Sequence, residues 1–154
     1  MTILGSRRLH WPSEAECAAT AAALAALPPL RDAYVELHGP LGAGKTTFAR
    51  HLLHALGVPG RIKSPTYAVM EPYEPPGLPV WHFDFYRFDD PQEWEDAGFR
   101  DVFASRGLKL AEWPEKAEGL VPEPDLSIRI EPRDDDSRDV TLDAMSPRGL
   151  ELLA

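Results

Sequence analysis

Residues 39–47 read Gly-Pro-Leu-Gly-Ala-Gly-Lys-Thr-Thr and match the pattern G-x-x-x-x-G-K-[ST] at all four defining positions. The glycines of such a loop let several backbone N–H groups converge on one phosphate without interference from Cβ atoms. Lys45 is expected to place its charge on the β- and γ-phosphate oxygens, and the Thr46 hydroxyl is expected to ligate Mg²⁺. The helix after the loop points its N-terminal dipole at the same anion. The pattern therefore predicts a nucleotide-binding P-loop.

The segments on either side of this loop have the structure that the motif requires. Residues 33–38 are predicted to form a buried strand, and residues 48–56 an amphipathic helix that Gly57 ends. A glycine-rich turn before a helix, with no ligand, is the alternative interpretation. The order of strand, loop and helix favours nucleotide binding over that alternative.

Two acidic residues stand where they could assist hydrolysis, which needs a Mg²⁺ ligand on a neighbouring strand and a group that orients water. Asp84 follows the apolar run 80–83, and Glu112 follows residues 108–111. Both acids are expected near strand ends, at the edge where ligands bind in open α/β sheets. In isolation, each would be interpreted as a solvated acid. Beside a P-loop, either acid can be the metal ligand while the other polarises water.

Three further side chains have both a functional and a structural interpretation. Thr66 follows the P-loop helix at the position of a switch segment that senses the γ-phosphate, or it belongs to a proline turn. His82 shares a strand face with Asp84, either as part of the site or as a packed core histidine. Trp113 either stacks on a base or fills the core, which is the more common fate of a tryptophan.

Length, charge and composition narrow the classes of function. A chain of 154 residues is sufficient for one domain with one core. Its net charge of −9 argues against direct binding of nucleic acid by this chain, since phosphate backbones are bound by clusters of lysine and arginine. The single cysteine, Cys17, excludes an internal disulfide. No guanine-reading Asn-Lys-x-Asp sequence is present, which favours ATP. The sequence shows neither a signal peptide nor a membrane span, so a cytoplasmic location is expected.

The remaining patterns predict one α/β unit. A Ser-x-x-Glu capping box at residues 13–16 predicts a helix to about Leu27. Asp90 as N-cap with Pro91 predicts a second helix, which ends near Gly98. Strands are predicted at 67–71, from residue 80, and at 107–113, 125–130 and 139–142, with the last two paired as a hairpin. This order predicts an α/β fold, a single P-loop NTPase domain over residues 1–154 with a mixed β-sheet flanked by helices.

Four motifs, taken in order, make the chain similar to the TsaE (YjeE) family, the P-loop ATPases of bacterial tRNA threonylcarbamoyladenosine (t6A) biosynthesis. They are the P-loop at 39–47, Ser-Pro-Thr-Tyr at 64–67, His-Phe-Asp-Phe-Tyr-Arg at 82–87 and Glu-Trp-Pro-Glu at 112–115. The P-loop alone is shared by many families, whereas the last two motifs together are far more specific. The resemblance covers nearly the whole chain.

The resemblance implies ATP and Mg²⁺ as cofactors and assigns roles to individual residues. It implies that Lys45, Asp84 and Glu112 are catalytic, and that Thr46, Glu112 and Asp84 ligate Mg²⁺. The residues that it implies for nucleotide binding are Leu41, Gly42, Ala43, Gly44, Lys45, Thr46, Thr47, Thr66, Trp113 and Arg138. The chain departs from the family at Pro40, where an acidic residue is usual. Phosphate binding is expected to survive this change, because the later glycines form the cradle.

The resemblance also implies partners. The family works with the TsaB and TsaD proteins, and TsaD transfers the threonylcarbamoyl group to adenosine 37 of tRNA. The TsaE-like ATPase is expected to reset that complex between turnovers, so tRNA is reached only through the partner complex. Two other functions fit the residues as well: a small-molecule kinase, and a nucleotide-regulated binding module without useful catalysis.

Overall fold

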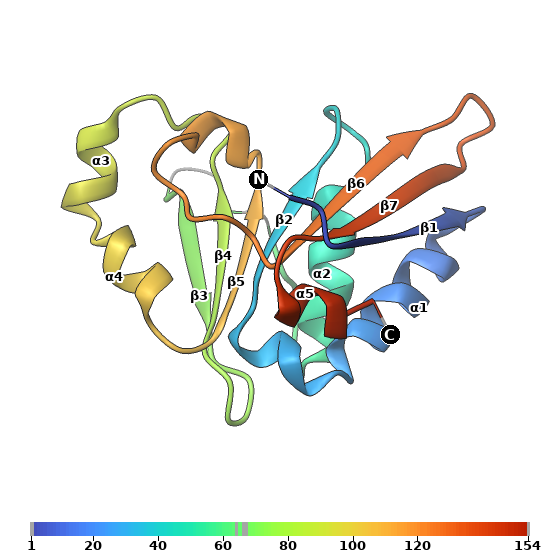
Figure 1. The fold of residues 1–154 in the computed structure, drawn as a ribbon, viewed down its shortest axis with the longest axis horizontal. Helices are drawn as coiled ribbons and strands as arrows, with labels where there is room; N and C mark the ends of the chain where they lie inside the picture. Colours follow the sequence, from blue (N-terminus) through green and yellow to red (C-terminus); the bar gives the residue numbers. More distant parts are fainter. Residues whose placement is uncertain (1, 64, 66–67, 154) are drawn as a thin grey trace.

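The computed structural model describes residues 2–63, 65 and 68–153. Within them, one mixed sheet has the strand order β1-β7-β6-β2-β5-β4-β3 (Figure 1). Its strands are β1 (Gly5–Trp11), β2 (Tyr34–His38), β3 (Met70–Tyr73), β4 (Val80–Asp84), β5 (Leu108–Glu112), β6 (Leu126–Pro132) and β7 (Arg138–Ala144). The helices are α1 (Glu14–Ala25), η1 (Pro28–Asp32), α2 (Lys45–Ala55), α3 (Pro91–Asp96), α4 (Phe99–Ala104), η2 (Pro114–Ala117) and α5 (Pro147–Glu151). The predicted α/β class with a mixed sheet is confirmed.

The parallel centre of the sheet brings the predicted acids to the P-loop. Strand β2 pairs in parallel with β5 and β6, and β4 pairs in parallel with β5. Because parallel strands end at the same edge, the ends of β2, β4 and β5 meet there. Glu112 is paired with Leu37 of β2 on one side and with Asp84 of β4 on the other. The loop at residues 39–44 leaves β2 at this edge.

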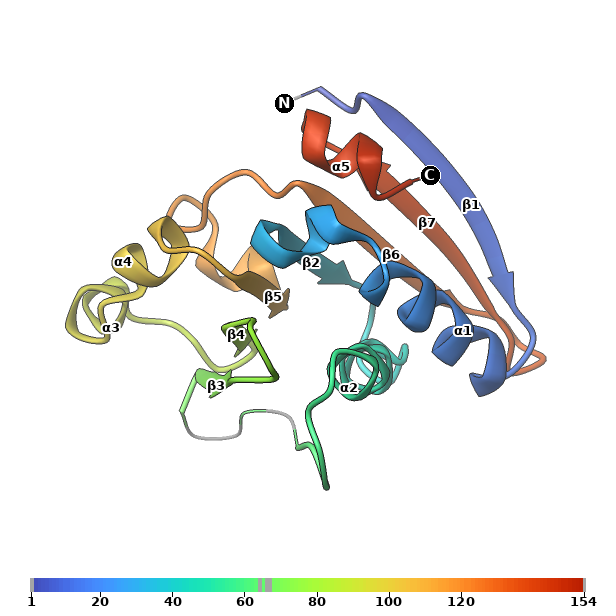
Figure 2. The same ribbon diagram turned by 90° about the horizontal axis from the view of Figure 1, so that it is seen from below.

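Two apolar clusters cover opposite faces of the sheet. Helices α1 and α2 lie side by side on one face (Figure 2), where Phe48 and Leu52 pack with Leu37 and Leu110. The second cluster is rich in aromatic rings and contains Phe83, Phe85, Phe88, Trp94 and Phe99. Helices α3 and α4 supply part of it, beside β3 and β4. Since side chains alternate along a strand, each central strand contributes to both clusters.

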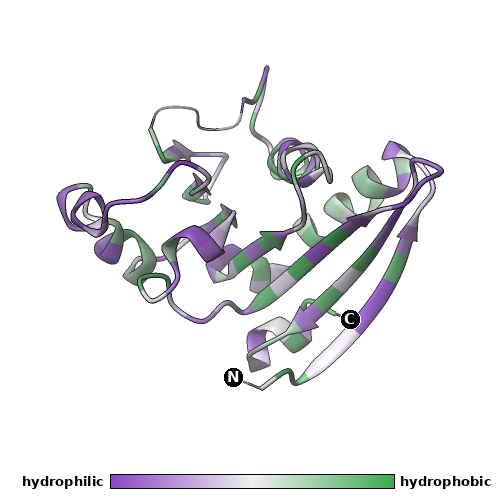
Figure 3. Ribbon diagram, turned by 90° about the horizontal axis from the view of Figure 1, so that it is seen from above, coloured by the Kyte–Doolittle hydropathy of each residue, from purple (hydrophilic) through white to green (hydrophobic). Residues whose placement is uncertain are grey.

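The hairpin of β6 and β7 was predicted and is confirmed. The two strands pair antiparallel, with Leu126, Ile128 and Ile130 of β6 buried at alternate positions. The ribbons in Figure 3 show this as alternating hydrophobic and hydrophilic bands. Alternation of this kind is the pattern of a strand with one face against a core. Among the residues that the structure describes, no helix is both long and apolar enough to cross a membrane.

The helix starts predicted from capping residues are also found. The backbone N–H of Ser13 donates to Glu16 Oε1 at 2.8 Å, which is the return bond of the capping box at the start of α1. The Ser13 hydroxyl donates to the same oxygen at 2.6 Å, and this bond contributes most to lowering the pKa of the Glu16 carboxyl. The carboxylate of Asp90 accepts from Gln92 N–H at 2.9 Å and caps α3. Local hydrogen-bonding rules therefore set these boundaries correctly.

Several elements differ from the predictions: η1, η2 and α5 were not predicted, and three further differences concern β1, β3 and α4. Strand β1 was not predicted, because its polar edge residues show no apolar alternation; it joins the sheet through antiparallel pairing with β7. Strand β3 runs from Met70 to Tyr73, later than the predicted 67–71, and residue 67 lies outside the described residues. Helix α4, also missed, follows Gly98, whose φ of 70° separates it from α3.

Gly149 of α5 is a position at which the fold tolerates no side chain. A Cβ there would lie 1.9 Å from Asp125 O and 3.2 Å from Ala144 Cα, both backbone atoms. We expect Gly149→Ala to lower the free energy of unfolding by about 1–3 kcal/mol or more, as overpacking does. Urea unfolding at equilibrium measures this loss. Gly5→Ala is the control, because its Cβ would meet only the movable side-chain ends of Leu150 and Leu153. Equal stability of the two variants would contradict the prediction.

Candidate functional site

The P-loop connects the end of β2 to the first turn of α2 and needs its glycines for backbone reasons. Gly39 has φ 151° and Gly44 has φ 110°, values that side chains disfavour. A Cβ on Gly39 would also lie 2.5 Å from Ile130 O. Inside the loop, Ala43 N–H donates to Pro40 O at 3.0 Å, so Pro40 takes part through its carbonyl and needs no N–H there.

A cavity of about 680 Å³ opens over this loop and the ends of β4 and β5. Its size is in the range of ligand-binding cavities in general. Its lining brings together the predicted residues Leu41, Gly42, Ala43, Gly44, Lys45, Thr46, Thr47, Asp84, Glu112, Trp113 and Arg138. Thr66, also predicted, lies outside the described residues. Five lining residues were not predicted as site residues: Pro65, Val69, Tyr86, Arg87 and Glu93.

Lys45 forms part of the cavity wall, and its ammonium contacts two groups of the protein. The side chain is buried, Nζ donates to Gly39 O, and Nζ lies 3.3 Å from the centroid of the Trp113 ring. Burial lowers the pKa of Lys45, and the nearby carboxylates of Glu112, Glu115 and Asp84 oppose this shift. Because the Lys45 ammonium contacts a carbonyl oxygen and a ring face, it has already lost part of its hydration. Binding of an anion then requires less further desolvation of this ammonium.

Glu112 is the acid that contacts the P-loop helix. Its Oε1 accepts from the Thr46 hydroxyl at 2.7 Å, and its Oε2 lies 2.7 Å from His82 Nε2. A hydroxyl and a carboxylate oxygen in contact are the donor types that Mg²⁺ prefers. No group of three His, Cys, Asp or Glu side chains within the described residues could hold a metal. The donor set therefore fits a cation that takes its remaining ligands from water and phosphate.

Asp84 occupies the same edge one strand away. It is paired with Glu112 across β4 and β5, and its Oδ1 accepts from Tyr86 N–H at 3.0 Å. Both acids line the cavity, as the strand pattern predicted. Since Thr46 bonds Glu112, Glu112 is the better placed acid to share a cation with that hydroxyl. Asp84 lies on the wall of the same cavity.

Trp113 forms an aromatic wall of the cavity from an unusual backbone conformation. Its φ of 56° and ψ of 46° are left-handed, a state that costs a residue with a side chain about 1–3 kcal/mol. Its ring packs against Tyr86 at 5.0 Å between centroids, as well as against Lys45 Nζ. Such strain clusters at functional sites. The sequence could not show this contact, because it depends on how the Pro114 turn folds back over the P-loop.

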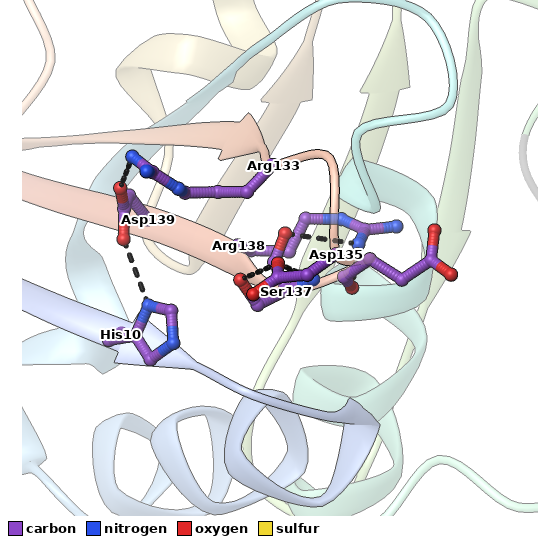
Figure 4. A network of polar contacts seen from close by, with 7 residues as sticks. His10, Arg133, Asp135, Ser137, Arg138 and Asp139 are labelled. Atoms are coloured by element: carbon purple, nitrogen blue, oxygen red, sulfur yellow. Dashed lines mark hydrogen bonds and ion pairs between the residues drawn. The ribbon is translucent and has the colours of Figure 1, made fainter.

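Arg138 reaches the P-loop from the start of β7. Its Nε donates to Ala43 O at 2.8 Å, and its guanidinium also bonds Asp136 O. Figure 4 shows the turn that orients it, where Asp135 Oδ1 accepts from both the N–H and the hydroxyl of Ser137. These hydrogen bonds lower the pKa of Asp135. The turn thus places a cation on the rim of the cavity, 95 residues along the chain from Ala43.

The same turn is tied to the edge strand β1. Asp139 accepts from His10 Nδ1 at 2.9 Å and from Arg133 at 2.8 Å (Figure 4). The hydrogen bond from His10 contributes most to lowering the pKa of Asp139, ahead of Arg133. All three side chains are exposed, so this arrangement adds little stability. The position of β7, and therefore of the arginine that begins it, is set by antiparallel backbone pairing with β1 and β6.

Comparisons with known proteins agree on one family. The family model described as "Threonylcarbamoyl adenosine biosynthesis protein TsaE" matches residues 11–140. The chain is 42% identical over 120 residues to the tRNA threonylcarbamoyladenosine biosynthesis protein TsaE of Haemophilus influenzae, covering 78% of this chain and 75% of that protein. It is 38% identical over 112 residues to the protein of that name from Bacillus subtilis, covering 73% and 70% of the two chains.

A solved structure extends the likeness to the whole fold. A crystal structure of YdiB from Bacillus subtilis superposes with a TM-score of 0.79 at 27% identity, covering 99% of this chain and 95% of that one. The residues that the family model matches, 11–140, include the P-loop, Asp84 and Glu112. The chain therefore belongs to the TsaE family of threonylcarbamoyl adenosine biosynthesis proteins.

Proposed function

We propose that this protein is a Mg²⁺-dependent ATPase that drives turnover of the TsaB–TsaD complex in tRNA t6A modification and does not itself transfer the threonylcarbamoyl group. The observation that carries the proposal is the contact between Thr46 and Glu112 in the P-loop cavity. A hydroxyl and a carboxylate in contact at the start of the P-loop helix are the donor types that would hold Mg²⁺ in a P-loop ATPase, and this supports the proposal. Membership of the TsaE family supplies the link to threonylcarbamoyl adenosine biosynthesis.

Each side chain of the cavity has a place in this reaction. The backbone N–H groups of the loop cradle the phosphates, with the N-terminus of α2 behind them. Lys45 exchanges its contacts with Gly39 and Trp113 for the phosphate oxygens. Thr46 and Glu112 hold Mg²⁺, which neutralises charge on the β- and γ-phosphates when it is bound. Asp84 orients the attacking water from the neighbouring strand end.

The division of labour between this protein and its partners follows from charge. The net charge of −9 opposes direct binding to tRNA, so we propose that TsaB and TsaD hold the RNA. Arg138 bonds the carbonyls of Ala43 and Asp136 in this structure, so its guanidinium is already committed to the loop. A P-loop site that lacks an arginine finger hydrolyses slowly by itself. We therefore propose that the partner complex accelerates hydrolysis.

The test is the rate of ATP hydrolysis by the purified protein, alone and with TsaB–TsaD and tRNA. We expect slow hydrolysis alone and a rise of at least about tenfold with the partners, since completion of a P-loop site in trans is worth at least that much. Lys45→Met is the negative control in both conditions. A rate of ATP hydrolysis that does not change at saturating TsaB–TsaD would contradict the coupled function. Transfer of labelled γ-phosphate to a metabolite would instead indicate a kinase.

A further inference from the structure

We propose that His82 is a positioning residue for Glu112, holding its carboxylate in the orientation in which Glu112 and Thr46 share one Mg²⁺. The inference rests on the proposed function and goes beyond it, because it assigns a role to a histidine that touches neither phosphate nor metal. His82 acts through Glu112 alone. It lies on β4, one strand from Glu112 on β5, and on the face of the sheet that α2 covers.

The geometry fixes the carboxylate from two sides. His82 Nε2 lies 2.7 Å from Oε2 of Glu112, and the Thr46 hydroxyl lies 2.7 Å from Oε1. His82 is 0% exposed and Glu112 is 2% exposed, so water does not compete for the bond between them. With one partner on each oxygen, rotation of the carboxylate breaks a buried hydrogen bond. When Thr46 turns to a cation, the bond from His82 is the one that remains.

The environment of His82 Nδ1 indicates which nitrogen of the ring carries the proton. His82 Nδ1 is buried and has no hydrogen-bond partner within the described part of the chain. A proton on Nδ1 would leave an unpaired N–H in an apolar environment, which is the more costly arrangement. The proton therefore lies on Nε2, which donates to the carboxylate of Glu112. An unpaired buried nitrogen is a cost that an apolar side chain at this position would avoid. The presence of histidine despite this cost therefore points to a role for its contact with Glu112.

A second His–Glu pair, which is partly buried, provides the contrast. His38 Nε2 donates to Glu36 Oε1 at 3.1 Å, and Tyr34 donates to the other oxygen of Glu36 at 2.7 Å. This pair lies on β2 and faces away from α2, so no P-loop hydroxyl reaches it. The two pairs have the same chemistry, and only the His82 pair borders the cavity through its glutamate.

The experiment compares ADP binding with MgCl₂ and with EDTA, measured by isothermal titration calorimetry on the full chain. The variants are His82→Leu, His82→Gln and His82→Asn, with His38→Leu as the matched control. Glutamine places its amide N–H near the position of Nε2, whereas asparagine is one methylene too short. Groups that orient a metal ligand typically change metal affinity by about 10–100-fold when removed.

We expect the Mg²⁺ enhancement of ADP affinity to fall by about 10–100-fold in His82→Leu and His82→Asn. His82→Gln and His38→Leu should keep the wild-type enhancement, and affinity in EDTA should be unchanged in all variants. If His82→Leu does not fold, the difference between the glutamine and asparagine variants decides the question. A wild-type enhancement in His82→Asn, or an equal loss in EDTA, would overturn the role. Absence of ADP binding by the wild-type protein would instead reject the proposed function.

Discussion

Replacing Lys45 with methionine is expected to lower the rate of ATP hydrolysis by about 10²–10³-fold, the cost of removing one transition-state donor from a preorganised site. Methionine keeps the apolar stem, so the substitution removes little except the charge. The pKa of Lys45 is lowered by burial and sustained by three carboxylates, and phosphate oxygens add to the favourable side. Steady-state hydrolysis, together with ADP affinity, measures the loss.

Lys109 provides the matched control. It too is a buried lysine whose ammonium donates to a backbone carbonyl, that of Ser105, and lies 5.5 Å from a tryptophan ring, that of Trp81. Burial lowers its pKa as it does for Lys45. Lys109 is the second residue of β5, whereas Glu112 ends the strand at the cavity. Lys109→Met should therefore cost stability and leave the hydrolysis rate of the folded protein unchanged. Equal losses of rate in the two variants would show that burial of a lysine, and not contact with phosphate, matters.

Much of this fold could be predicted from local sequence patterns, because each pattern depends on only a few neighbouring residues. The P-loop pattern fixed the strand, loop and helix around residues 39–47. The run before Asp84 and the run before Glu112 fixed the two strand ends, which the structure places in adjacent register. Capping rules gave the starts of α1 and α3. In each case the hydrogen-bonding or packing requirement is visible in neighbouring side chains.

The contacts that organise the site could not be predicted, because they depend on strand order. Nothing in the sequence states that β5 lies between β2 and β4, and only that order puts His82 beside Glu112. The same holds for Arg138, whose contact with Ala43 requires β6 to lie beside β2, so that the turn into β7 lies at the edge of the P-loop. Strand β1 was missed for a related reason. Its residues are mostly exposed, and it is held by pairing with β7 more than by burial of its own side chains.

The second large effect is expected from Glu112→Gln. The amide keeps the shape of the side chain and removes the charge that would face Mg²⁺, so hydrolysis should fall on the order of 10²–10³-fold. Charge stabilisation by a bound metal is worth several kcal/mol, and each ~1.4 kcal/mol is a factor of ten. Affinity for ADP in EDTA should stay at the wild-type level, because the phosphate cradle is untouched. Single-turnover hydrolysis separates this chemical step from binding and release.

Glu36→Gln tests whether the fall in hydrolysis rate in Glu112→Gln is specific to the metal site or would follow neutralisation of any buried carboxylate. Glu36 is 8% exposed and accepts hydrogen bonds from Tyr34 and His38, so its environment resembles that of Glu112 apart from the P-loop hydroxyl. Hydrolysis by Glu36→Gln should therefore stay close to that of the wild-type protein. If Glu112→Gln also hydrolyses normally, Asp84 is the metal ligand and Asp84→Asn should show the loss. If neither acid matters and partner binding still follows ATP, the protein acts as a nucleotide-regulated binding module, because hydrolysis without a charged metal ligand contradicts the ATPase mechanism.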